Sequence, residues 1–351
     1  MTSVADRRIE WQKQGLMALF LSVCLWLAGC QQPDRLHTLS GATMGTTWSV
    51  KMVGLPEGST LPQVQHDLQQ LLESINYQMS TYRSDSEISA FNQAPARSWV
   101  PISPDFVKVL DQALTLAALT DGAFDPTVGP LVNVWGFGPD AMTLTVPDAD
   151  RLQAARARVG YQRLQLDVQG GRLFQPGDAY LDLSSVAKGY AVDKLADYLV
   201  MRGVSRFLVE IGGELRASGV RPDGQPWRVA VERPLPGVRE VETVIEMKDM
   251  AMATSGDYRN FFEAEGQRFS HIIDPRSGRP VAHSLASVTV LSRRCSTADA
   301  WATALTVLGS EAGMRIAEQQ GLAVLFLDRT EQGVEEHRSG AFLDVLAGGA
   351  L

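Results

Sequence analysis

A carboxylate, two hydroxyls and an ammonium group lie within the seven residues Asp-Leu-Ser-Ser-Val-Ala-Lys, from Asp182 to Lys188. The pattern predicts a short strand over residues 180–183 that runs directly into a helix over residues 185–202. The free amides and partial positive charge of a helix N-terminus suit a phosphate. Lys188 would add a full charge, and Asp182 could accept hydrogen bonds from a ribose or a heterocycle. Taken alone, a serine that caps the helix beside two surface residues explains the same pattern.

A second segment, Ser-Thr-Ala-Asp-Ala-Trp-Ala-Thr, spaces an aspartate and a threonine by one helical turn. On a helix predicted over residues 298–308, Asp299 and Thr303 share one face. Oxygen ligands close to phosphates describe a Mg²⁺ site that keeps several waters and substrate oxygens. The common alternative is that Asp299 only stabilises the dipole of the helix as a first-turn acid.

Three loops add further candidates. Phe124 and Asp125 lie in a Gly- and Pro-rich turn that could meet an aromatic, hydrogen-bonding ligand or be only a rigid connection. Tyr82 follows an amphipathic helix in a polar stretch that would otherwise be a solvated loop. His271 lies on a predicted strand before a tight Asp-Pro-Arg-Ser-Gly turn. Because its pKa lies near working pH, it could be a general base, or it could be a structural, hydrogen-bonded histidine.

The elements that would position these residues alternate between helix and strand periodicity. This indicates a mixed α/β or α+β fold. Short turns between neighbouring strands favour mainly antiparallel sheets flanked by helices, so a doubly wound parallel sheet is not expected. Besides those above, the predicted helices cover residues 61–79 and 103–122. The predicted strands cover residues 46–53, 207–211, 250–253, 258–264, 269–273, 286–292, 322–328 and 341–346.

The N-terminus has the parts of an export signal. Three basic residues precede an apolar stretch of 13 residues, and small residues lie directly before Cys30. The apolar stretch is short for a membrane span. This pattern predicts a bacterial lipoprotein signal that is cleaved before Cys30, whose thiol is then acylated. An uncleaved signal anchor with a chance cysteine is the alternative.

The expected organisation is therefore a signal peptide over residues 1–29, a lipidated tether over 30–38, and one domain, or two intimate subdomains, over 39–351. Residues 1–29 carry three basic and two acidic side chains of a chain with net charge −8, which leaves −9 for the remainder. Such a charge argues against a nucleic-acid partner. Once Cys24 and Cys30 are set aside, only Cys295 remains, so no internal disulfide is expected.

Together and in this order, the segments resemble the ApbE family of FAD:protein FMN transferases. The resemblance covers nearly all of residues 40–345. It is carried by the run Gly-Ala-Thr-Met-Gly-Thr-Thr over residues 41–47 and by Tyr82, Asp125, residues 182–189, Gly212-Gly213, residues 271–278 and residues 299–303.

The resemblance implies an ApbE-type fold and an enzyme that uses Mg²⁺ to move FMN from FAD to a Ser or Thr hydroxyl, releasing AMP. The implied partners are acceptor proteins of membrane redox complexes with a Ser/Thr-Gly-Ala-Ser/Thr motif. By the same resemblance, His271 would help deprotonate the acceptor, and Asp299 would be catalytic and a metal ligand together with Ser185 and Thr303. The FAD site would comprise Met44, Tyr82, Ala123, Phe124, Asp125, Asp182, Lys188 and Ile272.

Two alternatives share this site: an FAD pyrophosphatase that gives FMN and AMP, and a non-enzymatic flavin-binding lipoprotein. A metal on the diphosphate argues against storage, and Tyr82 over the ligand argues against hydrolysis because it would exclude water. Glu214 occupies a position where relatives commonly have an amide, so it receives no ligand role. Ser40–Thr43 also resembles the acceptor motif, which makes self-flavinylation a minor hypothesis. Gln31 leaves the choice of membrane open, and the implied partners favour the periplasmic side of the inner membrane.

Overall fold

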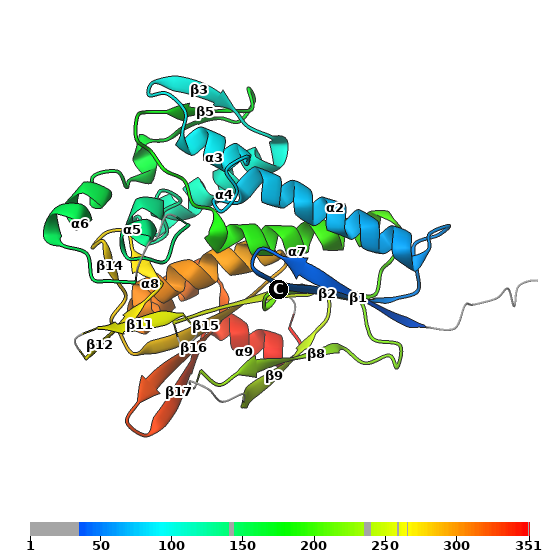
Figure 1. The fold of residues 1–351 in the computed structure, drawn as a ribbon. Helices are drawn as coiled ribbons and strands as arrows, with labels where there is room; N and C mark the ends of the chain where they lie inside the picture. The colour runs from blue at the N-terminus through cyan, green and yellow to red at the C-terminus, as the bar shows by residue number, and fades with distance from the viewer. Residues whose placement is uncertain (1–34, 140–143, 235–239, 258–259, 265, 350) are drawn as a thin grey trace, which may run out of the picture.

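An eight-stranded antiparallel sheet forms the centre of the molecule in the computed structural model, which describes residues 35–139, 144–234, 240–257, 260–264, 266–349 and 351 (Figure 1). Every pair of neighbouring strands in it is antiparallel. The expected α+β fold with mainly antiparallel sheets is therefore confirmed. In spatial order the strands are β1 (Leu36–Thr43), β2 (Thr46–Val53), β6 (Phe207–Ile211), β7 (Glu214–Ser218), β10 (Met250–Gly256), β15 (Leu285–Ser292), β16 (Ala323–Thr330) and β17 (Gly333–Arg338).

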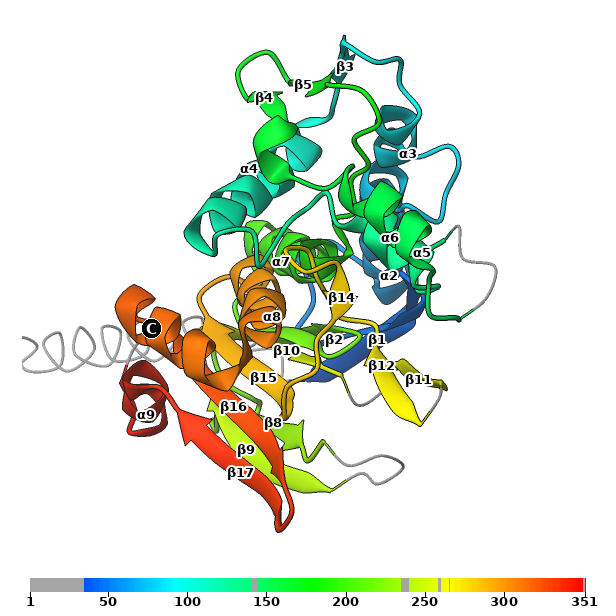
Figure 2. The ribbon, with the colours of Figure 1, turned by 90° about the vertical axis from the view of Figure 1, so that its left-hand side faces the viewer.

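Helices cover one face of this sheet. Figure 2 shows α7 (Ser184–Met201) and α8 (Cys295–Gln320) above the strands, and α7 packs in turn against α2 (Leu61–Met79) and α4 (Pro104–Leu119). Alternate strand residues such as Val288, Val290 and Phe326 point into this layer and are fully buried. The largest hydrophobic core thus lies between the sheet and α7 and α8.

The opposite face is covered by the hairpin of β8 (Trp227–Glu232) and β9 (Val241–Met247) and by α9 (Gly340–Leu346). Residues of β16 that point away from α8, Leu325 and Leu327, pack in this second core with Phe342. Because both faces are buried, β16 reads as a continuous apolar run rather than an alternating one.

A smaller layer above α7 contains short elements, visible at the top of Figure 2. It holds a three-stranded sheet of order β3-β5-β4, and two further hairpins form separate two-stranded sheets. The elements are α3 (Glu87–Asn92), β3 (Ser98–Pro101), α5 (Gly129–Val134), α6 (Ala149–Arg156), a 3₁₀ turn (Tyr161–Arg163), β4 (Gln165–Asp167) and β5 (Arg172–Gln175), with the hairpins β11 (Phe261–Ala264)–β12 (Gln267–Ser270) and β13 (Ile273–Asp274)–β14 (Arg279–Pro280).

Most predicted elements are present, including the helices that begin at Leu61 and Pro104 and the strand over 207–211. The helix predicted over 298–308 is longer. It begins at Cys295 and continues to Gln320 past Gly309, whose φ of 76° breaks the helical geometry. The strand predicted over 341–346 is wrong, because that segment is α9. The side chain of Ser339 accepts a hydrogen bond from the amide of Phe342, which starts a helix whose Phe342 is buried.

The strand predicted over 180–183 is also wrong. This extended segment pairs with a side chain instead of another strand: Asn92 accepts from the amide of Leu181 at 2.7 Å and donates to its carbonyl at 3.0 Å. The strand predicted over 269–273 is split into β12 and β13. The last residues of the expected tether, from Leu36, belong to β1.

The predicted signal peptide and Cys30 lie outside the described residues. In the described part of the chain, no helix is both long enough and apolar enough to cross a membrane.

Candidate active site

The centre of the candidate site is the contact between α7 and α8. The amide of Gly189 on α7 donates a 2.8 Å hydrogen bond to Oδ2 of Asp299 on α8. A Cβ atom on Gly189 would lie 2.4 Å from the carbonyl oxygen of Cys295 and 2.7 Å from Cβ of Asp299. Only glycine therefore lets the two helices approach this closely.

The predicted metal ligands lie on the facing sides of these helices. Asp299 is buried, and Thr303 follows one turn later on α8, where its hydroxyl lies 3.4 Å from that of Ser255 on β10. Ser185 precedes Gly189 by one turn on α7. The predicted oxygen ligands are thus carried by two helices in direct contact.

The surroundings of Asp299 disfavour its charged form. Burial raises the pKa of Asp299 to about 7; Lys188 opposes the rise and Glu214 adds to it. A divalent cation would stabilise the charged carboxylate. Within the described residues, no three His, Cys, Asp or Glu side chains gather as a metal site. The predicted set contains one such residue, Asp299, beside the hydroxyl of Thr303 and an oxygen of Ser185, and these hard oxygen donors fit Mg²⁺.

Lys188 forms a close ion pair with Glu214, the first residue of β7. Glu214 is 4% exposed, and its Oε2 atom is buried without a hydrogen-bond partner among the described residues. Burial raises the pKa of Glu214 against the opposing effect of Lys188. Asp299 and Glu214 together raise the pKa of Lys188, although its burial acts in the opposite direction. No role was predicted for Glu214 from the sequence, but it pairs with Lys188 and acts on the charge of Asp299.

Asp182 is held at the start of α7. Its Oδ1 accepts from the amide and the hydroxyl of Ser184, and its own amide donates to the carbonyl of Pro126 at 2.8 Å. Tyr82 is 71% exposed, and its hydroxyl donates to the carbonyl of Phe137 at 3.4 Å. Partial desolvation and the negative charge of Asp182 raise the pKa of Tyr82.

The loop over residues 121–130 points its side chains inward. Ala123 and Phe124 are buried, and Ala123 packs in one cluster with Ile272. The carboxylate of Asp125 accepts from Thr127 and from the amide of Tyr161 at 3.0 Å. Asp125 therefore braces this loop, and its contact with FAD stays a prediction.

His271 lies between β12 and β13. Its Nδ1 is 2.9 Å from the carbonyl of Asn260, and its ring meets the edge of Phe137 with centroids 6.2 Å apart. Because a carbonyl only accepts, Nδ1 carries the proton and Nε2 is the basic nitrogen. Burial lowers the pKa of His271, and Lys188 lowers it further, against Asn260 and Asp257. These properties suit a general base that is neutral at pH 7.

Met44 lies in the turn between β1 and β2 with a φ of 50°. The amide of Gly212 donates to the carbonyl of Thr47 at 3.0 Å, so this turn is next to the Gly212-Gly213 turn that leads into Glu214. The structure therefore joins segments that are far apart in sequence: the turn of Met44, the start of α7 and the first turns of α8.

Solved structures share this fold and sequence. The chain superposes on "Flavin Transferase ApbE from Vibrio cholerae" with a TM-score of 0.83 and 45% identity, covering 89% of this chain and 99% of that one. The apo form of Pseudomonas stutzeri flavinyl transferase ApbE gives a TM-score of 0.83 and 42% identity, covering 92% and 100%. The fold is that of the flavin transferase class of enzymes.

Sequence comparison gives the same result. The chain is 46% identical over 328 residues to the FAD:protein FMN transferase of Vibrio cholerae serotype O1, which covers 93% of this chain and 98% of that protein. The model of the ApbE family matches residues 44–326. The chain belongs to the ApbE family.

Proposed function

We propose that this chain transfers FMN from FAD to a Ser or Thr hydroxyl of an acceptor protein and releases AMP, with Mg²⁺ bound at Ser185, Asp299 and Thr303. The observation that carries the proposal is the buried Asp299 carboxylate, hydrogen-bonded to Gly189 and close to Lys188 at the start of α7. This arrangement gathers a carboxylate for a metal and a positive group for a phosphate in one place.

The reaction forms one bond between the acceptor oxygen and the phosphorus of the FMN moiety. The bond from that phosphorus to the oxygen bridging the two phosphates breaks, and AMP leaves with this oxygen. Phosphoryl transfer depends mainly on positioning and on stabilisation of the developing negative charge. The first amides of α7 and the ammonium of Lys188 supply positive potential, and Mg²⁺ would supply further neutralisation. Nε2 of His271, the ring nitrogen that does not contact Asn260, would take the proton of the acceptor hydroxyl.

The same proposal places the enzyme on the periplasmic side of the inner membrane, anchored by lipid on Cys30. The support is the signal pattern of residues 1–30 together with the start of β1 at Leu36. The five residues from 31 to 35 reach at most about 18 Å when extended. A lipid on Cys30 would therefore keep the domain near acceptor subunits of membrane redox complexes that carry the Ser/Thr-Gly-Ala-Ser/Thr motif.

The test mixes the domain with FAD, Mg²⁺ and a carrier protein bearing the acceptor motif, and follows flavin fluorescence on a denaturing gel. The expected result is a fluorescent carrier and one AMP per label. Asp299→Ala should abolish labelling at millimolar Mg²⁺, and a carrier whose acceptor Thr is replaced by Val should stay dark. Free FMN and AMP with an unlabelled carrier would show a pyrophosphatase instead, and bound, unchanged FAD would show a storage protein.

A further inference from the structure

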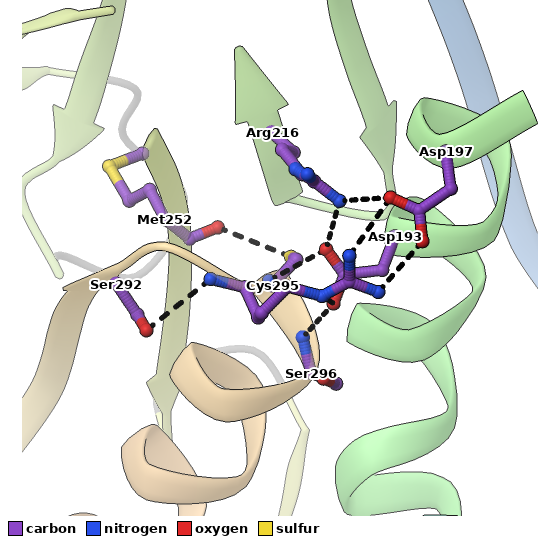
Figure 3. A network of polar contacts seen from close by, with 8 residues as sticks. Asp193, Asp197, Arg216, Met252, Ser292, Cys295 and Ser296 are labelled. Carbon is purple, nitrogen blue, oxygen red and sulfur yellow. Dashed lines mark hydrogen bonds and ion pairs between the residues drawn. The ribbon is translucent and has the colours of Figure 1, made fainter. Parts of the chain in front are cut away.

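Asp193 is a buried carboxylate on α7 that the proposed reaction does not use. Its side chain is fully buried and lies one turn beyond Gly189. The first two amides of α8, those of Cys295 and Ser296, each donate a hydrogen bond of 3.0 Å to it (Figure 3). A side chain of α7 thus caps the N-terminus of α8.

Two arginines compensate the buried charge. Arg216 on β7 donates to Asp193 at 3.0 Å, and Arg294 lies 3.2 Å from it. Asp197, one turn further along α7, contacts the same two arginines at 2.8 and 2.9 Å. Asp197 makes no hydrogen bond to α8 itself in the described structure, because its partners are the arginine side chains. The two aspartates therefore share their ion pairs and differ in their contact with the start of α8.

The Asp193 cap and the predicted metal ligands lie along the same line of contacts between α7 and α8. Ser185, Gly189 and Asp193 follow one another at four-residue steps on α7, and Cys295, Asp299 and Thr303 do so on α8. Gly189 contacts Asp299, and Asp193 contacts Cys295, so the helices run in opposite directions along this seam. Continued by one step, the same seam sets Ser185 beside Thr303. Asp193 lies eight residues, about 12 Å, from Ser185 along the helix.

A helix normally receives its cap from the residue just before it. Arg294, the residue before α8, makes no side-chain cap. The cap comes instead from Asp193, 102 residues earlier in the chain. The cap therefore sets how far α8 is shifted along its own axis relative to α7. Because Asp299 and Thr303 are on α8, this shift also sets their positions.

We propose that Asp193 is a positioning residue for the metal site: its hydrogen bonds to the first amides of α8 set the register that brings Asp299 and Thr303 to Ser185 and Lys188. The inference rests on the proposed function for its metal. It assigns the role to the amide hydrogen bonds of Asp193 and not to its ion pairs.

The matched pair Asp193→Asn and Asp197→Asn tests this assignment. Both variants remove one charge from the same arginine cluster, but only Asp193→Asn places an amide NH₂ against the start of α8. Mn²⁺ binding to the full-length protein is measured by electron paramagnetic resonance, and the Mg²⁺ concentration for half-maximal FMN transfer is measured separately. We expect Asp193→Asn to raise the Mn²⁺ dissociation constant and the half-maximal Mg²⁺ concentration at least tenfold, with a maximal rate within a few-fold of wild type. Asp197→Asn should change these two quantities less than threefold.

Hydrogen exchange at the amides of Cys295 and Ser296 gives a second readout, and faster exchange is expected only in Asp193→Asn. Should that variant fail to fold, Asp193→Glu keeps the charge but displaces the acceptor oxygens by about 1.5 Å, one C–C bond, and the same rise is expected. Equal Mn²⁺ affinity in the Asp193 variant and wild type, or equal weakening in both Asn variants, would overturn the inference. If the wild-type protein transfers no FMN but Asp193→Asn still weakens Mn²⁺ binding, the proposed function is wrong and the positioning role of Asp193 stands.

Discussion

The amide of Gly189 and the carboxylate of Asp299 are joined by a 2.8 Å hydrogen bond across two helices that lie 110 residues apart in sequence. The contact depends on the missing side chain of Gly189, since a Cβ there would come within 2.7 Å of Cβ of Asp299. The position of the Asp299 carboxylate, the proposed metal ligand, therefore depends on the backbone of α7.

Gly189→Ala should separate the helices and reduce FMN transfer at least tenfold. Overpacking costs about 1–3 kcal/mol, and alanine recovers about 1 kcal/mol of this through its helix propensity, so we expect a small loss of stability and a larger loss of activity. Thermal unfolding and labelling measure the two effects. Gly340→Ala is the control, because its new Cβ would meet no atom closer than 3.5 Å; equal losses in both variants would contradict the explanation.

Substitutions of Thr303 can distinguish a metal ligand from a residue that only packs, because they keep or remove its hydroxyl. Thr303→Ser keeps the hydroxyl and should retain FMN transfer within a few-fold. Thr303→Val keeps the shape and should raise the Mg²⁺ requirement at least tenfold, because a ligand oxygen is lost. Titrations of labelling rate against Mg²⁺ compare the two. A valine variant with the wild-type Mg²⁺ dependence would remove Thr303 from the ligand set.

The sequence was sufficient for the local part of this site. The four-residue spacing of Asp299 and Thr303 predicted a shared helix face, and α8 has it. The periodicity of the apolar residues of α2, and the serine and proline at the start of α4, were readable in the sequence. Local patterns report on local structure, which explains why these predictions were confirmed.

Contacts between distant segments were not readable. The glycine at position 189 is visible in the sequence, but nothing near it shows that another helix lies against it. The same holds for Glu214, which lies beside Lys188 only because β7 is next to α7 in the fold. The segment of α9 was mistaken for a strand, since its apolar residues suit either element and the cap of Ser339 decides between them.

The ion pair of Lys188 and Glu214 should contribute a favourable coupling energy to the free energy of unfolding. Glu214→Ala leaves the ammonium without its partner, and Lys188→Met leaves a buried carboxylate. Each single change should cost about 1–3 kcal/mol, below the range for fully buried pairs because the Lys188 side chain is 31% exposed. The double variant should cost less than the sum. Urea unfolding of the four proteins gives the coupling energy, and strict additivity would show that the pair contributes nothing.

The rate of FMN transfer should depend on pH through the protonation of His271. Burial lowers its pKa below the usual 6.5, so the imidazole is neutral at pH 7 and gains a proton only as the pH falls below that value. Since the neutral form is the base, the rate should fall with decreasing pH with a midpoint below 6.5 and be constant above it. His271→Gln should lower the plateau about 10²–10⁴-fold and abolish this dependence, whereas His66→Gln, an exposed histidine of α2, should change neither.

Asp299, with a pKa of about 7, could produce a similar fall in rate, and Mg²⁺ distinguishes the two groups. A bound cation favours the charged carboxylate and lowers the pKa of Asp299. A midpoint that moves to lower pH as Mg²⁺ rises from limiting to saturating concentration therefore belongs to Asp299. A midpoint that persists unchanged at saturating Mg²⁺ and disappears in His271→Gln belongs to His271. A wild-type profile at saturating Mg²⁺ that shows no fall in rate as the pH decreases below 6.5 would show that His271 does not remove the acceptor proton.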